Sequence, residues 1–167
     1  MKEFTSVFII TRATKAIISK DSTFYRSLIL EGKTERHSLH KPEQIIDNTC
    51  LLYGSTLSGR RTAVKDILKI NSKIPVPVIP DNGVYMLPTS STKSKDCVWL
   101  SYDHIDFYEQ RGDKTFVAFT DGSGMYVNAS ESTLDMQHKR ASQLIVKLNR
   151  SILFGRRNNP FYGNFHG

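Results

Sequence analysis

The sequence predicts a single α+β domain with an antiparallel β-rich body, short central helices and a C-terminal helix. A length of 167 residues, 39% of them hydrophobic, suits one domain that buries its own core. Short runs of β-branched and aromatic residues between polar breaks indicate strands over most of the chain. Apolar spacings of three and four residues indicate helices in the middle and near the end. We expect the domain to span residues 1–155, followed by a tail over 156–167.

The first 40 residues predict a meander of short strands. The glycine at position 32 suits one of its turns. The strand runs are SVFIITR (6–12), TKAIISK (14–20), STFYRSLIL (22–30) and ERHSLH (35–40).

A short helix is predicted over residues 41–54. Pro42 suits a first helical turn, Glu43 complements the helix dipole there, and Gly54 suits the position just past the end.

A second helix is predicted over residues 58–73, with Ser58 as a possible cap. Arg61, Lys65 and Lys69 are spaced four apart, which places them on one ridge of that helix. An extended segment from Lys69 onward is the alternative. The apolar face would consist of Ala63, Val64, Ile67 and Leu68.

Residues 74–130 return to β character. Pro75, Pro77 and Pro80 place the stretch 74–89 at a sheet edge or outside the sheet, with a tight turn at Asn82–Gly83. A polar loop over 89–96, a strand over 97–109 and a hairpin around Asp121–Gly122 follow.

The last predicted element is a helix capped by Ser130 or Ser132 and ended by Gly155. We expect its apolar stripe to face the core rather than an oligomer partner. The stripe consists of Ala141, Leu144, Ile145, Leu148 and Ile152.

Composition favours a soluble cytoplasmic protein with a polyanionic partner. The net charge is +7, and no apolar run approaches a membrane span or a secretion signal. Cys50 and Cys97 are too few and too far apart for a zinc site or a disulfide framework. We expect free, mostly buried thiols, with no metal and no cofactor.

The segment GSTLSGRR (54–61) nearly matches a phosphate-binding loop of nucleotide hydrolases. Gly54 and Gly59 have the required spacing, but Arg60 replaces the lysine and Arg61 replaces the hydroxyl residue that binds magnesium. Nucleotide hydrolysis is therefore disfavoured.

No other pattern indicates an enzyme. His37 and His40 lack a third ligand nearby, and we expect them to be exposed strand residues. In an alternating strand, His104 would share a face with Tyr102 and Asp106, as a surface pair rather than an acid–base site.

The basic residues concentrate in two regions. Residues 58–73 carry five basic residues against one acidic residue, and residues 130–157 carry six against two. Each region is either a solvated helix face or a surface that follows nucleic-acid phosphates.

The order of several landmarks resembles the ComK family of bacterial competence transcription factors. The resemblance covers about residues 43–107, through IIDNTCLLYGSTLSGRR (45–61), KINSKIPVPV (69–78), VYMLPTSS (84–91) and CVWLSYDHI (97–105). The individual landmarks are Asp47, Cys50, Gly54, Ser55, Gly59, Arg60, Pro75, Pro88, Thr89, Cys97, Trp99 and His104.

This resemblance implies a nucleoid-associated transcriptional activator and no enzyme. Members bind A/T-rich boxes of double-stranded DNA, largely through the minor groove, as dimers that pair on one promoter, and they act on RNA polymerase. Only the Gly-Ser…Gly-Arg segment matches closely enough to nominate contacts. The expected DNA-binding residues are Arg60 and Arg61, then Lys65, Lys69, Lys73 and Ser55.

Longer members carry a further C-terminal extension that contributes to activation and to capture by a proteolytic adaptor. This sequence stops at Gly167 after a short tail, so neither property is carried over. We expect a shortened member that binds DNA and either activates weakly or modulates another member.

Two other functions fit the same charge. One is an RNA-binding module, suggested also by Tyr102 and Tyr108 if they are exposed. The other is a protein–protein regulator whose basic surface binds an acidic partner, which predicts no salt-steep binding to duplex DNA.

Overall fold

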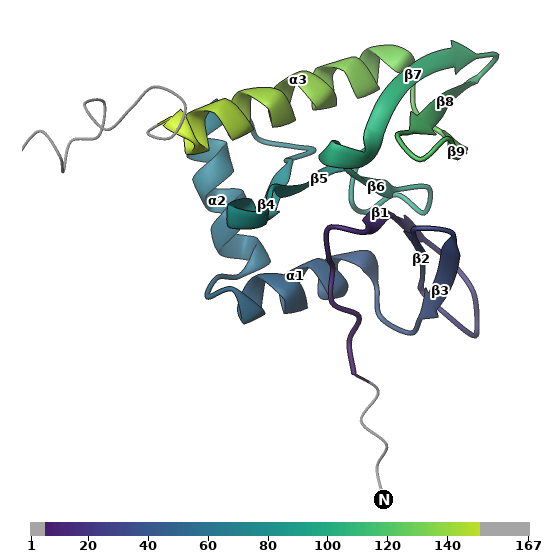
Figure 1. Cartoon of the computed structure of the whole chain (residues 1–167), viewed down its shortest axis with the longest axis horizontal. Coiled ribbons are helices and arrows are strands. Elements are labelled where there is room, and N and C mark those ends of the chain that lie inside the picture. The colour runs from purple at the N-terminus through teal and green to yellow at the C-terminus, as the bar shows by residue number, and fades with distance from the viewer. Residues whose placement is uncertain (1–5, 151–167) are drawn as a thin grey trace, which may run out of the picture.

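Six antiparallel strands form the central sheet of the protein, in the order β3-β2-β1-β6-β5-β4 (Figure 1). The computed structural model describes residues 6–150. The strands are β1 (Thr14–Ser19), β2 (Ser27–Glu31), β3 (Thr34–Ser38), β4 (Val76–Ile79), β5 (Val84–Pro88) and β6 (Val98–Ser101). The first three form the predicted meander, and proline-containing β4 lies at the sheet edge, as predicted.

A second sheet of three strands and three α-helices complete the described fold. The second sheet has the order β7-β8-β9, with β7 (Ile105–Arg111), β8 (Lys114–Phe119) and β9 (Gly124–Val127). The helices are α1 (Pro42–Leu52), α2 (Leu57–Leu68) and α3 (Glu131–Leu148). The α+β prediction, both short central helices and the C-terminal helix are confirmed.

The central sheet is buried on both faces except at its β3 edge, which produces three layers. On one face, Ile17 and Trp99 pack against Ile45 and Ile46 of α1. The opposite face packs against the second sheet and α3 (Figure 1). Adjacent strand residues point to opposite layers, and every residue of β5 and β6 is buried. Each large apolar side chain among them contributes about 1.5–3 kcal/mol when fully buried.

Helix α3 covers one end of the sheet and packs against α2. Ser130 caps α3 by accepting a hydrogen bond from the Thr133 N–H. In the predicted apolar stripe, Ala141 and Leu144 are fully buried, whereas Leu148 is 41% exposed. Ile152 and Gly155 lie outside the described residues.

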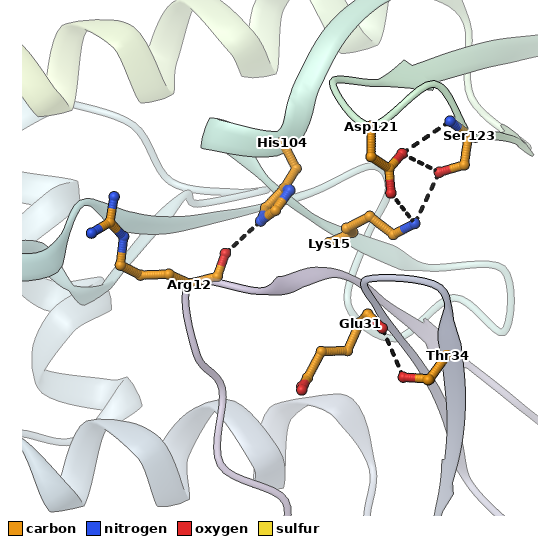
Figure 2. Close-up of polar contacts among 7 residues, drawn as sticks. All are labelled: Arg12, Lys15, Glu31, Thr34, His104, Asp121 and Ser123. Atoms are coloured by element: carbon orange, nitrogen blue, oxygen red, sulfur yellow. Dashed lines mark hydrogen bonds and ion pairs between the residues drawn. The ribbon is translucent and has the colours of Figure 1, made fainter.

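Two strand predictions are wrong. Residues 6–12 form no strand; they cross α1 instead, where the buried Ile10 N–H donates to Thr49 Oγ1 at 3.0 Å. The run 97–109 is not one strand, because a 3₁₀ turn over Tyr102–His104 separates β6 from β7. The predicted alternation around His104 therefore fails, and its Nε2 is hydrogen-bonded to the Arg12 carbonyl (Figure 2).

A buried lysine joins the two sheets. Lys15 of β1 is 5% exposed, and its Nζ lies 2.9 Å from Asp121 Oδ2 and 2.9 Å from Ser123 Oγ in the β8–β9 turn (Figure 2). Hydrogen bonds from Ser123, followed by Lys15, hold the pKa of the Asp121 carboxyl well below its usual range. The pair anchors the predicted hairpin around Asp121–Gly122 to the central sheet.

Asp121→Asn is expected to lower the thermal midpoint at pH 7 more than Lys15→Met. The first change leaves a buried ammonium without its counter-charge, whereas the second removes the buried charge. Circular-dichroism melting of both variants tests this order, and equal losses of thermal midpoint would contradict it.

The stabilisation by Asp121 depends on pH. Because the folded-state pKa of Asp121 is depressed, its contribution to the free energy of unfolding is complete above the unfolded-state pKa of about 3.9 and is lost as the pH falls. The difference between wild type and Asp121→Asn should therefore shrink in acid.

Candidate nucleic-acid interface

The junction between α1 and α2 is held by capping contacts at both helix ends. Gly54, with a φ of 80°, follows the C-terminus of α1, as predicted. Asp47 of α1 accepts the Leu57 N–H at Oδ1, 2.9 Å away, at the start of α2. This contact sets the position of α2 against α1.

Thr56 caps α2, so the expectation that Ser58 does so is wrong. The Gly59 N–H donates to Thr56 Oγ1 at 2.9 Å. A Cβ at Gly59 would lie 3.1 Å from the same oxygen, so glycine permits this close cap. The two glycines of the loop-like motif therefore serve helix ends.

Arg61 lies between an acidic side chain and an aromatic ring. Its Nη1 is 2.8 Å from Glu43 Oε2 of α1, and its guanidinium lies 5.9 Å from the ring centre of Trp99. The Arg61 side chain keeps 24% of its surface exposed. Arg61 is thus held in place by the fold while one side remains open to solvent.

Arg60 points toward the interior. It is half-buried, and its buried Nε has no hydrogen-bond partner among the described residues. Burial raises the pKa of the nearby Cys50 thiol, and the Arg60 charge offsets only part of that rise. Cys50 and Cys97 are both buried and free, which confirms the thiol prediction for the described part of the chain.

The four remaining nominated residues do not form one ridge. Lys65 is exposed on α2 and has no ion-pair partner within residues 6–150. Lys69 leaves the helix in a left-handed conformation, and its Nζ pairs with Asp66 at 3.2 Å. Lys73 is half-buried with a φ of 49°, and half-buried Ser55 donates its N–H to the Cys50 carbonyl. Helix α2 ends at Leu68, so the predicted ridge stops at Lys65.

Arg61 and Lys65 meet in a hollow of about 420 Å³ between the two helices, which we name the α1–α2 hollow. Lys69, Lys73 and Ser55 do not line it. Its lining residues are Glu43, Gln44, Asp47, Leu57, Ser58, Arg61, Thr62 and Lys65.

Two basic residues of α3 contact the backbone around the end of α2. Arg140 Nη1 donates to the Ser72 carbonyl at 2.9 Å, and Lys147 Nζ donates to the Ile67 carbonyl at 3.2 Å. These carbonyls lie at and beyond the C-terminal turn of α2, where basic groups are favourable. These two residues of the second basic region therefore stabilise the contact between α3 and the end of α2.

The two tyrosines that suggested RNA stacking are not exposed. Tyr102 is half-buried, with its hydroxyl 2.7 Å from Ser142 Oγ and its ring stacked on His138. The Tyr108 hydroxyl donates to Asp135, and burial together with this carboxylate raises the pKa of Tyr108 to about 12. Both rings pack against α3, which corrects the expectation of exposed aromatics.

The two histidines considered as metal ligands lie in different surroundings. His37 is exposed on β3 as predicted, whereas His40 is half-buried in the connection to α1. Within residues 6–150, no group of three or more His, Cys, Asp or Glu side chains could hold a metal ion. Over the same range, no helix combines the length and apolarity needed to cross a membrane.

Comparison with known proteins assigns the chain to a family. The family profile described as ComK protein matches residues 5–152. The chain belongs to the ComK family. A Competence transcription factor of Bacillus subtilis (strain 168) is 31% identical over 137 residues, which cover 81% of this chain and 65% of that protein. The chain thus matches less than two thirds of the length of this ComK relative. No solved structure matches the chain.

The fold of this ComK family member gathers five basic residues around a second hollow, although they are scattered along the sequence. A groove of about 640 Å³ lies beside the start of α1, with the buried Trp99 among its lining residues. We name it the basic groove. Its cations come from separate segments, and only the fold places them together. They are Lys20, Arg26, Lys41, Lys93 and Lys95.

Arg61→Ala is expected to lower the free energy of unfolding by about 1 kcal/mol, since it removes a partly exposed ion pair and a cation–π contact. Lys65→Ala should change it by less than about 0.5 kcal/mol, because its side chain is exposed and has no ion pair with any described residue. Urea denaturation followed by Trp99 fluorescence measures both. An Arg61→Ala variant as stable as Lys65→Ala would contradict the anchoring role of Arg61.

Proposed function

We propose that this chain is a transcription factor that binds double-stranded DNA and activates competence genes. The observation that carries the proposal is its 31% identity to a Competence transcription factor, together with membership of the ComK family. The proposed promoter sites are A/T-rich boxes contacted largely through the minor groove, with RNA polymerase as the further partner. Binding as a dimer, or as two paired dimers, belongs to the same proposal.

The α1–α2 hollow supports this function with charged groups placed for phosphate contact. Lys65 is exposed and free of ion pairs within the described residues, and Arg61 is fixed by Glu43 and Trp99 with one side open. Cations in such positions attract the DNA backbone and release its counterions. Lys69, Lys73 and Ser55 do not line the hollow, and half-buried Arg60 does not line it either, so these four residues are assigned lesser roles.

The direct test is a salt series on the protein's own upstream region. Purified protein is footprinted on that duplex at several salt concentrations, with a minor-groove drug and a single-stranded RNA as competitors. Steep salt dependence and displacement by the drug support the proposal. Preference for the RNA favours an RNA-binding module, and weak binding without salt dependence favours a regulator that binds an acidic protein.

Lys65→Gln is expected to reduce the slope of log affinity against log salt by about one, because one phosphate contact is lost. Lys114→Gln is the matched control, since Lys114 is also exposed but lies on β8. Fluorescence anisotropy on an A/T-rich duplex measures both slopes. Equal slopes for the two variants would remove Lys65 from the interface.

Glu43→Gln is expected to tighten duplex binding by about twofold to fivefold, because it removes an anion from the hollow and frees Arg61 for phosphate. Loss of the Glu43–Arg61 ion pair should lower the free energy of unfolding by no more than about 1 kcal/mol. Anisotropy at fixed salt gives the affinity, and thermal melting gives the stability. Weaker binding by a folded Glu43→Gln variant would show that Glu43 positions Arg61 productively.

A further inference from the structure

The basic groove is built from three segments that are far apart in the sequence. One wall is the β1–β2 connection with Lys20 and Arg26, and another is the start of α1 with Lys41. The third wall is the β5–β6 connection with Lys93 and Lys95. The strand order brings the β1–β2 and β5–β6 connections together, because β1 pairs with both β2 and β6.

The positive charge of the groove is only partly neutralised by the protein. Among the described residues, the acidic side chains that line the groove are Asp21 and Glu43. Both already have partners: Asp21 pairs with Lys95 at 3.2 Å, and Glu43 pairs with Arg61. Within residues 6–150, the other four cations of the groove have no ion-pair partner. These four are Lys20, Arg26, Lys41 and Lys93. Like charges gathered around a hollow repel one another and attract an anion.

The groove is continuous with the α1–α2 hollow. Glu43 and Gln44 line both, and the Arg61 guanidinium lies over Trp99, which lines the groove. Cations therefore follow one path from the β5–β6 connection, past the start of α1, to Lys65 of α2.

The chemistry of the path fits a polymer of phosphates better than a small anion. Of the five groove cations, four are exposed and Lys20 is half-buried, and they stand on separate segments around an open hollow rather than converging on one point. Such cations contact a charged backbone along its length and carry no sequence information themselves. A single bound phosphate group would reach only part of this path.

We propose that the basic groove binds the sugar–phosphate backbone of the same DNA duplex that the α1–α2 hollow contacts, so that one continuous surface follows the duplex across α1. This inference rests on the proposed DNA-binding function. It assigns to Lys20, Arg26, Lys41 and Lys93 a role in affinity and in setting the register of the protein on DNA, without base selection.

The test uses a triple variant, Lys20→Gln, Arg26→Gln and Lys93→Gln, in the full chain. The control is Lys33→Gln, Lys114→Gln and Lys139→Gln, which removes the same charge from exposed positions outside the groove. Anisotropy on an A/T-rich duplex and on a scrambled duplex of equal length is measured across a salt series. The groove variant should lose about two to three units of salt slope on both duplexes, whereas the control should stay close to wild type.

A second measurement leaves the sequence unchanged. Lysines of the wild-type protein are acetylated with and without duplex, and the modified sites are quantified by mass spectrometry. Lys20, Lys41 and Lys93 should be protected by DNA severalfold, while Lys33 and Lys114 should react equally in both samples. This result decides the question even if the triple variant does not fold.

The outcomes separate the two proposals. If wild type binds no duplex with steep salt dependence, the DNA-binding function fails and this inference fails with it. If wild type binds steeply and Lys65→Gln weakens it, but groove lysines stay reactive and the groove variant keeps its slope, only the groove assignment is overturned.

Discussion

Burial of the central sheet on both of its faces is the constraint on which the rest of the molecule depends. Trp99 and Leu100 are neighbours in β6, yet Trp99 packs toward α1 and Leu100 toward the second sheet. A shift of one residue in this strand would exchange the two layers. Because the layer containing Trp99 also supports α1 and α2, the positions of Arg61 and Lys65 follow from the register of the sheet.

Elements with local signals could be predicted from the sequence, and elements defined by tertiary contacts could not. Pro42 and Gly54 bounded α1 correctly, and the prolines before Gly83 placed β4 at an edge, because these residues restrict their own backbone. The run 97–109 has uniform β character, and nothing local marks the turn at Tyr102–His104 that sends β7 into another sheet. The basic groove could not be predicted either, because its cations are far apart in the sequence and adjacent only in the folded protein.

Basic side chains with the same formal charge have different structural roles in this protein. Lys15 is buried and joins two sheets, Arg140 and Lys147 donate to backbone carbonyls around the end of α2, and Arg61 is shared between Glu43 and the solvent. Counting basic residues along the sequence treats all of them alike. The structure separates cations occupied by the fold from those, such as Lys65 and Lys93, that face solvent with no ion-pair partner in the described range. Only the second group is available to a partner without cost to the fold.

The two outer strands of the central sheet hinder pairing with a strand of another molecule in different ways. Pro77 lies within β4 and has no N–H, so a foreign strand could not form a full ladder there. At the other edge, β3 presents Glu35, Arg36 and His37 on an exposed strand, and charge there discourages stacking of one molecule on the next. Neither outer strand of the sheet is therefore suited to backbone pairing between two copies of this protein, so a contact between copies would have to use side-chain surfaces.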